Sequence, residues 1–389
     1  MGSSLPDRQR SLAILAAWCP ILTRSILNRA RPSRPTERQE PTVQTNPNPN
    51  PNPNPNPNPN PNPAPDAAGL RDRYDVVVIG GAAAGLSAAL TLARARRSVL
   101  VVDAGQPRNT PADGVHNYLG REGTPPADLV AIGRREVGGY GGEVTAGLVT
   151  AVDRGADGGF EVRLDDGRRT GARHVLLATG ARDELPDLPG LAERFGRDVL
   201  HCPYCHGWEV RDQAVGVLAS TPMAMHQVLL LRQWSADVTL FLNDVLEPTE
   251  AEWEQLSARG IAVVDGAVAA VESADDRLTG VRLASGSFVP RAALAVQTRV
   301  FAQVGPLEGL GLRAEDFEVG GTVFGTYLPT DAKGETSVPG LWAAGNVADV
   351  STQVITAAAA GMRAGAQINA ALVTQDTAAA VETGRLAPA

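Results

Sequence analysis

Cysteine is scarce in this chain: only three occur among 389 residues, and two of them, Cys202 and Cys205, form a single C-x-x-C. So few cysteines exclude a disulfide-stapled secreted scaffold, and the C-x-x-C spacing indicates redox or metal chemistry instead. Long apolar runs are also missing, since none approaches the roughly 18 residues that a membrane span needs. With 43% hydrophobic and 20% charged residues, the composition is that of a globular protein and excludes an integral membrane protein.

Lysine is almost absent, and Lys333 is the single one among 35 basic residues of a chain whose net charge is -8. Residues 1–73 hold nine Arg against five Asp or Glu, a balance of +4, so residues 74–389 carry -12. An acidic body lacks the basic surface that nucleic acid attracts. We therefore expect no nucleic-acid partner.

The N-terminal residues 1–73 are predicted to be an extension. Residues 46–63 are nine consecutive Asn-Pro dipeptides, in which proline removes every second backbone donor and biases each Asn away from helix. We expect a disordered or extended spacer there. The apolar segment 12–22 follows Arg8 and Arg10 and imitates a secretion signal, but no small-x-small cleavage site follows it. The expected location is therefore cytoplasmic.

A strand, a turn, a helix and a second strand are predicted over 75–79, 80–85, 86–95 and 98–103. This succession within about 30 residues is the unit of a parallel sheet. The G-x-x-x-x-G turn places backbone N–H groups and the positive end of the helix against a pyrophosphate, although its middle position is alanine. The alternative is a turn that only packs the helix on the strand.

A second strand–turn–helix–strand unit is predicted over 214–242. Two further apolar strands, 174–178 and 340–344, end in Thr-Gly and Gly-Asn, and a helix is expected over 354–372. The polar residues that follow these strands are at the edge of a sheet, where ligands of open α/β sheets bind.

The redox candidate is His201-Cys-Pro-Tyr-Cys-His206. Two cysteines at this spacing can close into a small disulfide ring, and His206 titrates near neutrality and can exchange protons with the thiols. A zinc site is the competing interpretation, but four ligands within six residues cannot easily surround one ion, and the chain has no second C-x-x-C. A purely structural cysteine pair is the other alternative.

Four segments, in this order, resemble the low-molecular-weight thioredoxin reductase family: V-V-V-I-G-G-A-A-A-G-L-S-A-A-L, A-T-G-A-R, C-P-Y-C-H-G-W-E and T-S-V-P-G-L-W-A-A-G-N. The resemblance covers about residues 74–375. It implies an α/β fold of two Rossmann-like three-layer domains. The FAD domain is expected over 74–189 and 298–375, an inserted NAD(P)-type domain with the C-x-x-C over 190–297, and a tail over 376–389.

The resemblance also implies a role for each residue that matches a family motif. The expected FAD contacts are Gly80, Gly81, Ala84 and Gly85 at the pyrophosphate, Asp103 at the adenosine ribose, Asn117 in the flavin region, Ala178, Thr179 and Gly180 along the cofactor, Gly345 and Asn346 at the ribityl chain, and Gln353 and Val354 at the pyrimidine edge. Cys205 is expected to lie against the flavin, Cys202 to exchange with the substrate, and His206 to exchange protons.

The second nucleotide unit departs from the family pattern. At the turn where family reductases carry glycines for NADPH, this chain has Ala219-Ser-Thr-Pro-Met-Ala224, whose side chains occupy the place of bare backbone. After the next strand, Asn243-Asp244 stands where a 2′-phosphate clamp needs arginine. His206 also replaces the family's usual Asp, and C-x-x-C-H resembles the flavin-dependent dithiol oxidases of disulfide natural products.

The sequence therefore predicts an FAD enzyme that oxidises a dithiol through Cys202 and Cys205, with oxygen or another non-nicotinamide acceptor. An NADPH-dependent thioredoxin-disulfide reductase is the first alternative, and a non-enzymatic redox sensor is the second. The expected partners are a small or protein-borne dithiol or disulfide and a second copy of the chain in a homodimer. No metal and no membrane partner are expected.

Overall fold

The structure, a computed structural model, describes residues 69–386. The predicted Asn-Pro spacer at 46–63 and the apolar segment 12–22 lie outside the described residues. The chain divides into two units, Met1–Pro59 and Asn60–Ala389, and every described residue belongs to the second unit.

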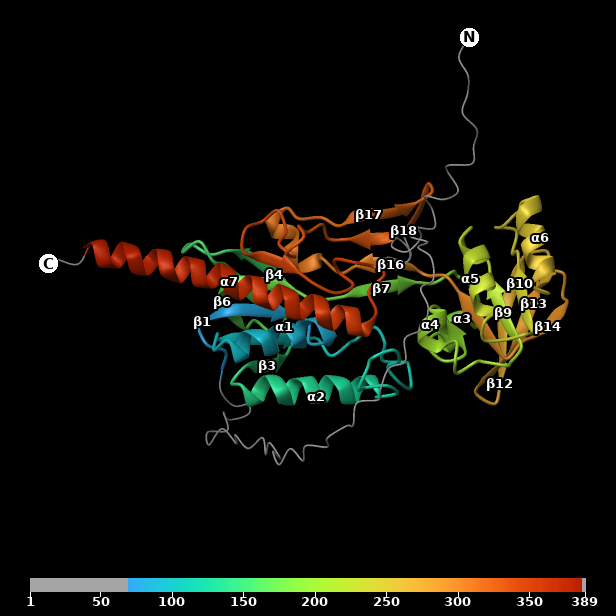
Figure 1. Ribbon diagram of the computed structural model, residues 1–389, viewed down its shortest axis with the longest axis horizontal. Coiled ribbons are helices and arrows are strands. Elements are labelled where there is room, and N and C mark those ends of the chain that lie inside the picture. The colour runs from blue at the N-terminus through green and yellow to red at the C-terminus, as the bar shows by residue number, and fades with distance from the viewer. Residues whose placement is uncertain (1–68, 387–389) are drawn as a thin grey trace, which may run out of the picture. The chain divides into compact units, whose positions relative to one another are not determined.

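A seven-stranded sheet contains strands from both ends of the described chain (Figure 1). Its order is β3-β2-β1-β6-β5-β4, and β19 pairs in parallel with β6. The strands are β1 (Arg73–Ile79), β2 (Val99–Asp103), β3 (Glu143–Ala146), β4 (Val149–Arg154), β5 (Phe160–Leu164), β6 (Arg169–Leu177) and β19 (Leu341–Ala343). Because β1 pairs in parallel with both β2 and β6, the first predicted strand–turn–helix–strand unit is confirmed.

Strand β1 lies inside the seven-stranded sheet and is buried on both faces. Val76 and Val78 pack with helices α1 (Ala83–Arg94), α2 (Pro126–Gly139) and α7 (Val354–Leu386). Val77 and Ile79 point to the other face and pack with β4, β5 and the 3-10 helix η3 (Gly305–Leu310). A strand that is covered on both faces has a continuous apolar sequence, which explains the run of valines.

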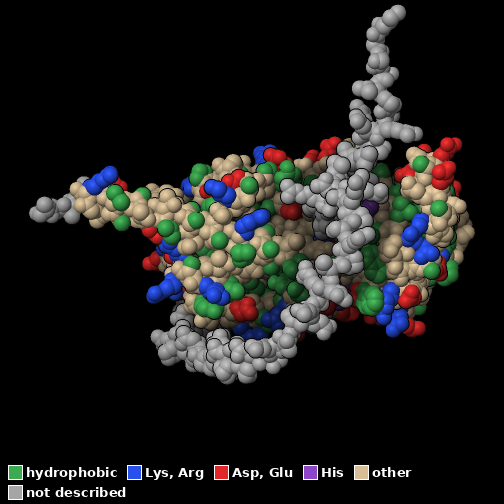
Figure 2. Space-filling view, viewed as in Figure 1, with side chains coloured by type: hydrophobic (Ala, Val, Ile, Leu, Met, Phe, Trp, Pro, Cys, Tyr) green, Lys and Arg blue, Asp and Glu red, His purple; other side chains and the backbone are tan. Residues whose placement is uncertain are grey.

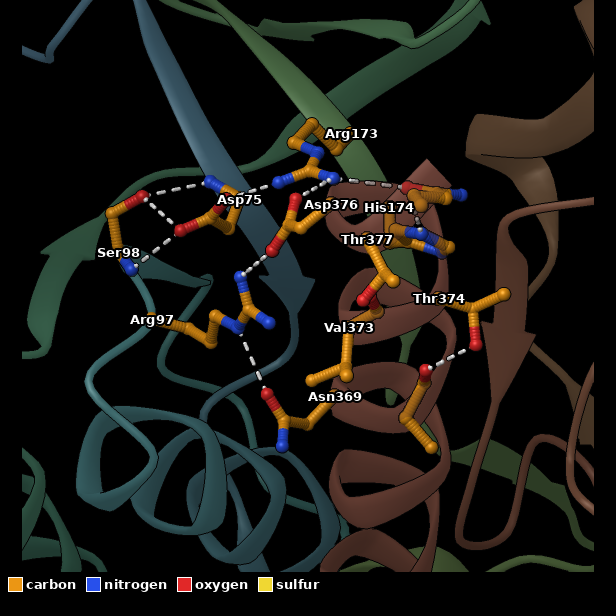
Figure 3. Close-up of polar contacts among 12 residues, drawn as sticks. Asp75, Arg97, Ser98, Arg173, His174, Asn369, Val373, Thr374, Asp376 and Thr377 are labelled. Atoms are coloured by element: carbon orange, nitrogen blue, oxygen red, sulfur yellow. Dashed lines mark hydrogen bonds and ion pairs between the residues drawn. The ribbon is translucent and has the colours of Figure 1, made fainter. Parts of the chain in front are cut away.

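Helix α7 is longer than the sequence analysis predicts, because it continues past residue 372 to Leu386. The Asp376 carboxylate fixes the added turns to the sheet, accepting from Arg97 and Arg173 at 2.6 Å each (Figure 3). The residues from 378 to 380 are alanines, the best helix formers. Residues 376–386, which the sequence analysis assigns to a tail, are therefore part of α7.

The second nucleotide-type unit has its own five-stranded sheet, in the order β11-β10-β9-β15-β8. Its strands are β8 (Val199–Leu200), β9 (Val215–Leu218), β10 (Val238–Phe241), β11 (Ala262–Val264) and β15 (Ala293–Val296), and its helices are α3 (Leu191–Arg194), α4 (Pro203–His206), α5 (Ala224–Leu231) and α6 (Glu250–Ala258). A three-stranded sheet of β12 (Val268–Ala274), β13 (Arg277–Leu283) and β14 (Phe288–Pro290) packs on Leu218 and Phe241. All pairs in the five-stranded sheet are parallel, so the second predicted unit is also confirmed.

A four-stranded sheet joins the segments that enter and leave this second unit. Its order is β17-β18-β16-β7, from β7 (Ala181–Glu184), β16 (Arg299–Ala302), β17 (Glu315–Val319) and β18 (Thr322–Tyr327). β7 precedes the unit in sequence, β16 follows it, and the two pair antiparallel. The two connections are therefore hydrogen-bonded to each other.

The described surface mixes charges of both signs, and acidic side chains gather over α6 (Figure 2). Helix α6 contributes Glu250, Glu252 and Glu254 to this group. Among residues 69–386, no helix combines the length and the apolar character that a membrane crossing demands.

Candidate functional site

The turn between β1 and α1 is built from close backbone approaches. A Cβ on Gly81 would lie 2.6 Å from the Asp103 side chain, and one on Gly85 would lie 1.9 Å from the Gly80 carbonyl oxygen. Helix α1 begins after Ala82 without a side-chain cap, so its first N–H groups stay available to an anion. These features fit the pyrophosphate of FAD.

Asp103 and Ala84 have protein partners in the same region. Asp103 ends β2 and accepts from the Gly105 N–H at 3.1 Å, while its other oxygen pairs with Arg134 of α2. Arg134 was missed by the sequence analysis, since nothing in its spacing connects it to β2. Ala84 is buried, and its Cβ would lie 3.0 Å from a Cβ placed on Gly345.

Two strand ends follow the neighbouring strands β6 and β19. Thr179 donates its hydroxyl to the Gln303 carbonyl at 2.7 Å, and Gly180 adopts φ +70° with open space where a Cβ would stand. After Gly345, the Asn346 amide donates to the Thr352 carbonyl at 2.9 Å and also contacts the carbonyls of residues 349 and 350. Asn346 therefore shapes the loop that leads into α7.

The two thiols lie at the start of α4. Cys202 is the N-cap residue, and its Sγ is 2.7 Å from Cys205 Sγ. The hydrogen bond from Cys205, helped by backbone N–H groups of Tyr204 and Cys205, lowers the pKa of Cys202 to about 7. The same hydrogen bond and burial raise the pKa of Cys205. The short contact between the two sulfurs therefore favours a thiolate on one sulfur and a proton on the other.

Two of the predicted flavin-region residues contact the thiol segment. Asn117 donates its side-chain amide to the Tyr204 carbonyl at 2.6 Å, and Gln353 Nε2 is 4.0 Å from Cys202 Sγ. Val354 is the first residue of α7. The structure thus brings Asn117, Gln353 and the cysteines together from three distant parts of the sequence.

His206 is half-buried at the end of α4. Its Nε2 is buried and has no hydrogen-bond partner among the described residues. Burial lowers the pKa of His206, and nearby His116 lowers it further, whereas Glu209 and Asp113 act in the opposite direction. A neutral imidazole with an unused ring nitrogen can accept a proton.

A charged network that the sequence analysis missed lies next to the thiols. Arg108 donates twice to Asp183 of β7, at 2.5 and 2.6 Å, and Thr298 donates its hydroxyl to the same carboxylate at 2.6 Å. Although burial acts to raise it, these hydrogen bonds keep the pKa of Asp183 below its usual range. Burial and the Arg108 charge lower the pKa of His201 to about 4, and Arg108 also favours both thiolates.

The polar groups of the turn after β9 are hydrogen-bonded within the protein. The Thr221 carbonyl accepts from Ala224 N–H at 3.1 Å, and its hydroxyl contacts Met223 N–H at 3.3 Å and the Gln297 side chain. The Pro222 carbonyl accepts from Met225 N–H at 3.4 Å. The N–H groups of Met223, Ala224 and Met225, at the start of α5, therefore already have protein acceptors.

Asn243 occupies the region that follows β10. Its amide donates to the Ala219 carbonyl at 3.2 Å, and its side-chain oxygen accepts from Val268 N–H at 2.8 Å. Asn243 and Asp244 both adopt left-handed backbone, with φ 54° and 52°. Asn243, at the position where the 2′-phosphate of NADPH would need an arginine, therefore connects the turn after β9 to β12 through its side-chain hydrogen bonds.

Among residues 69–386, no group of three or more His, Cys, Asp or Glu side chains is arranged to hold a metal ion.

Comparison with known sequences identifies close relatives. The sequence pattern of the pyridine nucleotide-disulphide oxidoreductase family matches residues 74–364. Thioredoxin reductase tcpT of Claviceps purpurea (strain 20.1) is 33% identical over 316 residues, which are 77% of this chain and 95% of that protein.

Solved structures have the same fold. The crystal structure of HlmI aligns with a TM-score of 0.74 and 46% identity, over 82% of this chain and 98% of that chain. The putative thioredoxin reductase TrxB of Bacillus anthracis aligns with a TM-score of 0.70 and 28% identity, over 78% of this chain and 99% of that chain.

Proposed function

Because this chain belongs to the pyridine nucleotide-disulphide oxidoreductase family and is an FAD-dependent, thioredoxin reductase-like enzyme, we propose that it oxidises dithiols through Cys202 and Cys205. The proposed overall reaction joins the two sulfurs of the substrate in a disulfide and passes two electrons to oxygen or another non-nicotinamide acceptor. FAD, when bound, supplies the two-electron acceptor between the thiols and that final oxidant.

The observation that carries this proposal is the turn after β9. A dinucleotide pyrophosphate is held by backbone N–H groups at a helix N-terminus, and those of α5 are already bonded to Thr221 and Pro222. The clamp position holds Asn243, whose amide is used inside the protein. NADPH would have to displace these bonds, and charge-assisted contacts of about 1.5–3 kcal/mol each would be missing at its 2′-phosphate.

The proposed thiol chemistry gives the two cysteines different roles. One substrate thiolate attacks Cys202 Sγ of the Cys202–Cys205 disulfide, so that a mixed disulfide forms and Cys205 leaves as a thiolate. The second substrate thiolate attacks the substrate sulfur of the mixed disulfide, which closes the product disulfide and releases Cys202 as a thiolate. The low pKa of Cys202 makes it a good leaving group in this second exchange.

His206 is the proposed acceptor for a substrate proton. The S–H bond breaks, the proton moves to His206 Nε2, and the sulfur keeps the electron pair. The support is the position of His206 directly after Cys205 and its unpartnered, buried Nε2 within the described structure.

The substrate is proposed to be small and partly apolar. Two aromatic side chains close to the thiols in the sequence are exposed: Tyr204 is 58% exposed and Trp208 is 64% exposed. The Arg211 guanidinium lies 4.2 Å from the centre of the Trp208 ring. Leu119, two residues after Asn117, is 94% exposed. Such a surface favours an apolar dithiol with planar groups.

The second candidate is an NADPH-dependent thioredoxin-disulfide reductase, which the names of the relatives favour. Homodimer formation and a cytoplasmic location stay predictions in either case. A non-enzymatic sensor is the least favoured alternative, since the matched family and the relatives are named as oxidoreductases and reductases.

The deciding experiment mixes the FAD-loaded protein anaerobically with dithiothreitol, NADPH or NADH in a stopped-flow spectrometer. We expect dithiothreitol to bleach the flavin absorbance at least about 100-fold faster than NADPH or NADH does. Dithiothreitol can react directly with the Cys202–Cys205 disulfide, whereas the N–H groups that a nicotinamide cofactor needs at the start of α5 are already hydrogen-bonded to the protein. Cys202→Ser is the matched control and abolishes the fast phase with dithiothreitol. Rapid bleaching by micromolar NADPH or NADH would overturn the proposal in favour of the reductase.

A further inference from the structure

The segment that follows the second thiol carries a cation to which the proposed reaction gives no role. Tyr204, Trp208 and Arg211 follow one another at helical spacing along this segment. Their side chains are all exposed. The segment therefore presents two aromatic rings and a guanidinium to the solvent.

The backbone places the second ring next to a redox thiol. The Gly207 N–H donates to the Pro203 carbonyl at 2.7 Å, and Gly207 itself adopts right-handed helical backbone. The helical path of α4 therefore continues as far as Trp208. Residues three apart on such a path are neighbours, with Cβ atoms about 5–6 Å apart. Trp208 thus stands beside Cys205.

The guanidinium of Arg211 is fixed on the Trp208 ring. It lies 4.2 Å from the ring centre, and its Nη1 donates to the Trp208 carbonyl at 2.8 Å. Arginine is charged at every pH at which the protein is handled, and its planar fork matches a carboxylate. Within the described part of the chain, no carboxylate forms an ion pair with Arg211, and the carboxylate of Glu209 lies 3.4 Å from His116 Nε2. The other guanidinium nitrogens are therefore available to an anion from outside the protein.

The base of this segment is anchored in the protein. Val210 is buried in the core of the second nucleotide-type unit. The Arg211 N–H donates to the Trp208 carbonyl at 3.3 Å, and the Gln213 side chain donates to the Glu209 carbonyl at 3.2 Å. A ring and a cation that are already held in place lose less conformational entropy when a ligand binds.

We propose that Arg211, stacked on Trp208, is a specificity-determining residue that selects dithiol substrates bearing a carboxylate. The inference rests on the proposed dithiol oxidation and names the substrate class of that site. While a substrate sulfur reaches Cys202, the substrate body lies against the Trp208 ring, and its carboxylate accepts hydrogen bonds from the Arg211 guanidinium. No bond of the substrate forms or breaks at Arg211, which contributes to binding alone.

The test compares two dithiols that differ in charge: dihydrolipoate, which has a carboxylate, and dihydrolipoamide, its neutral amide. The second-order rate constant of anaerobic flavin bleaching is measured for each with the FAD-loaded protein. The readout is the ratio of the two constants, because a change in the thiols or the flavin alters both constants alike. In the wild type at low ionic strength we expect a ratio of about 3–10 in favour of dihydrolipoate, which falls toward one as salt is added.

Four variants identify the group that sets this ratio. Arg211→Gln should bring the ratio to about one, because the charge is lost, and Arg211→Glu should invert it. Arg211→Lys keeps the charge without the planar fork, so its ratio should lie between those of the wild type and Arg211→Gln. Trp208→Leu should lower both constants and reduce the ratio, because the ring that supports the guanidinium is gone.

Arg282→Gln is the matched control. Arg282 also stacks on a ring, with its guanidinium 4.8 Å from the Phe288 ring centre, but it belongs to β13. This variant changes the net charge by the same amount as Arg211→Gln and should keep the wild-type ratio. An equal fall of the ratio in both variants would assign the effect to net charge and overturn the inference.

The remaining outcomes separate the inference from the proposed function. If both dithiols bleach the wild-type flavin with equal constants, or if Arg211→Gln keeps the wild-type ratio, the Arg211 inference is wrong and the proposed function stands. If neither dithiol bleaches the flavin while micromolar NADPH does, the proposed function is wrong and the inference fails with it. If the Arg211 variants do not fold, the wild type still decides the question, because a ratio that salt does not lower would overturn the inference.

Discussion

The β1–α1 and β9–α5 units follow the same path from a buried parallel strand through a turn into a helix, but they use the donors of the turn differently. In the first, glycines bring backbones together and the helix starts without a side-chain cap. In the second, Thr221 and Pro222 supply acceptors to the helix start, and Asn243 bonds across the turn. The comparison teaches that a nucleotide-type fold persists when its ligand-binding groups bond to the protein itself.

The two units also differ in what they give to the reaction. The β1–α1 turn is suited to hold an anionic cofactor, whereas the β9–α5 unit presents Cys202, Cys205 and His206 on the short helix α4. The second unit is thereby a carrier of thiols. On the proposed function, a missing nucleotide leaves this role intact, because the thiol segment packs on α5, where the Gln227 side chain donates to the His201 carbonyl at 2.8 Å.

The most extensive expected effect comes from Gly85→Val in the first turn, because this change affects both the FAD content and the stability of the fold. A Cβ there would stand 1.9 Å from the Gly80 carbonyl oxygen, so helix and strand must separate. We expect FAD content to fall at least tenfold and stability to fall by about 1–3 kcal/mol. The absorbance at 450 nm per mole of protein measures the FAD content, and thermal melting measures the stability.

Gly138→Ala is the control for this change, because nothing lies within 4 Å of a Cβ at Gly138. Its FAD content and melting temperature should match the wild type. Full FAD content in Gly85→Val would show that the two turns do not differ in the way we infer.

The next effect concerns the thiols of the second unit. Cys202→Ser and Cys205→Ser should each lower turnover by about 10³-fold or more, since disulfide exchange needs both sulfurs. Only Cys202→Ser should give a long-wavelength absorbance band, because it keeps Cys205 and removes the hydrogen bond that chiefly raises the pKa of Cys205. A band in both variants, or in neither, would contradict the assignment of Cys205 to the flavin side.

The smallest effect is expected from Thr221→Gly in the second turn. This change removes the hydroxyl contacts with Met223 N–H and Gln297 and adds backbone freedom, so stability should fall by about 1–2 kcal/mol while dithiol oxidation continues. Thr221→Ser, which keeps the hydroxyl, should stay near the wild type in thermal melting. Rapid bleaching by NADPH in Thr221→Gly would show that this single turn had blocked the nucleotide.

The sequence predicted the α/β class, both parallel units and the membership in the thioredoxin reductase-like family, because buried runs and glycine spacing are local signals. It underestimated α7, since the contacts that hold Asp376 come from Arg97 and Arg173, far away in the chain. The predicted site residues Asn117 and Gln353 both contact the thiol segment, at Tyr204 and at Cys202, although their roles toward FAD stay predictions.

By itself, the sequence determined which chemistry the chain carries: a cysteine pair followed by histidine, a glycine turn for a pyrophosphate, and a second turn without glycines. Tertiary structure alone decided which charges surround the thiols. Arg108, Asp183 and His116 have no spacing that links them to the thiol segment. They lie near it only because the loop before α2 and strand β7 pack there. The electrostatic field at a site depends on distances in space, which the order of residues along the chain does not specify.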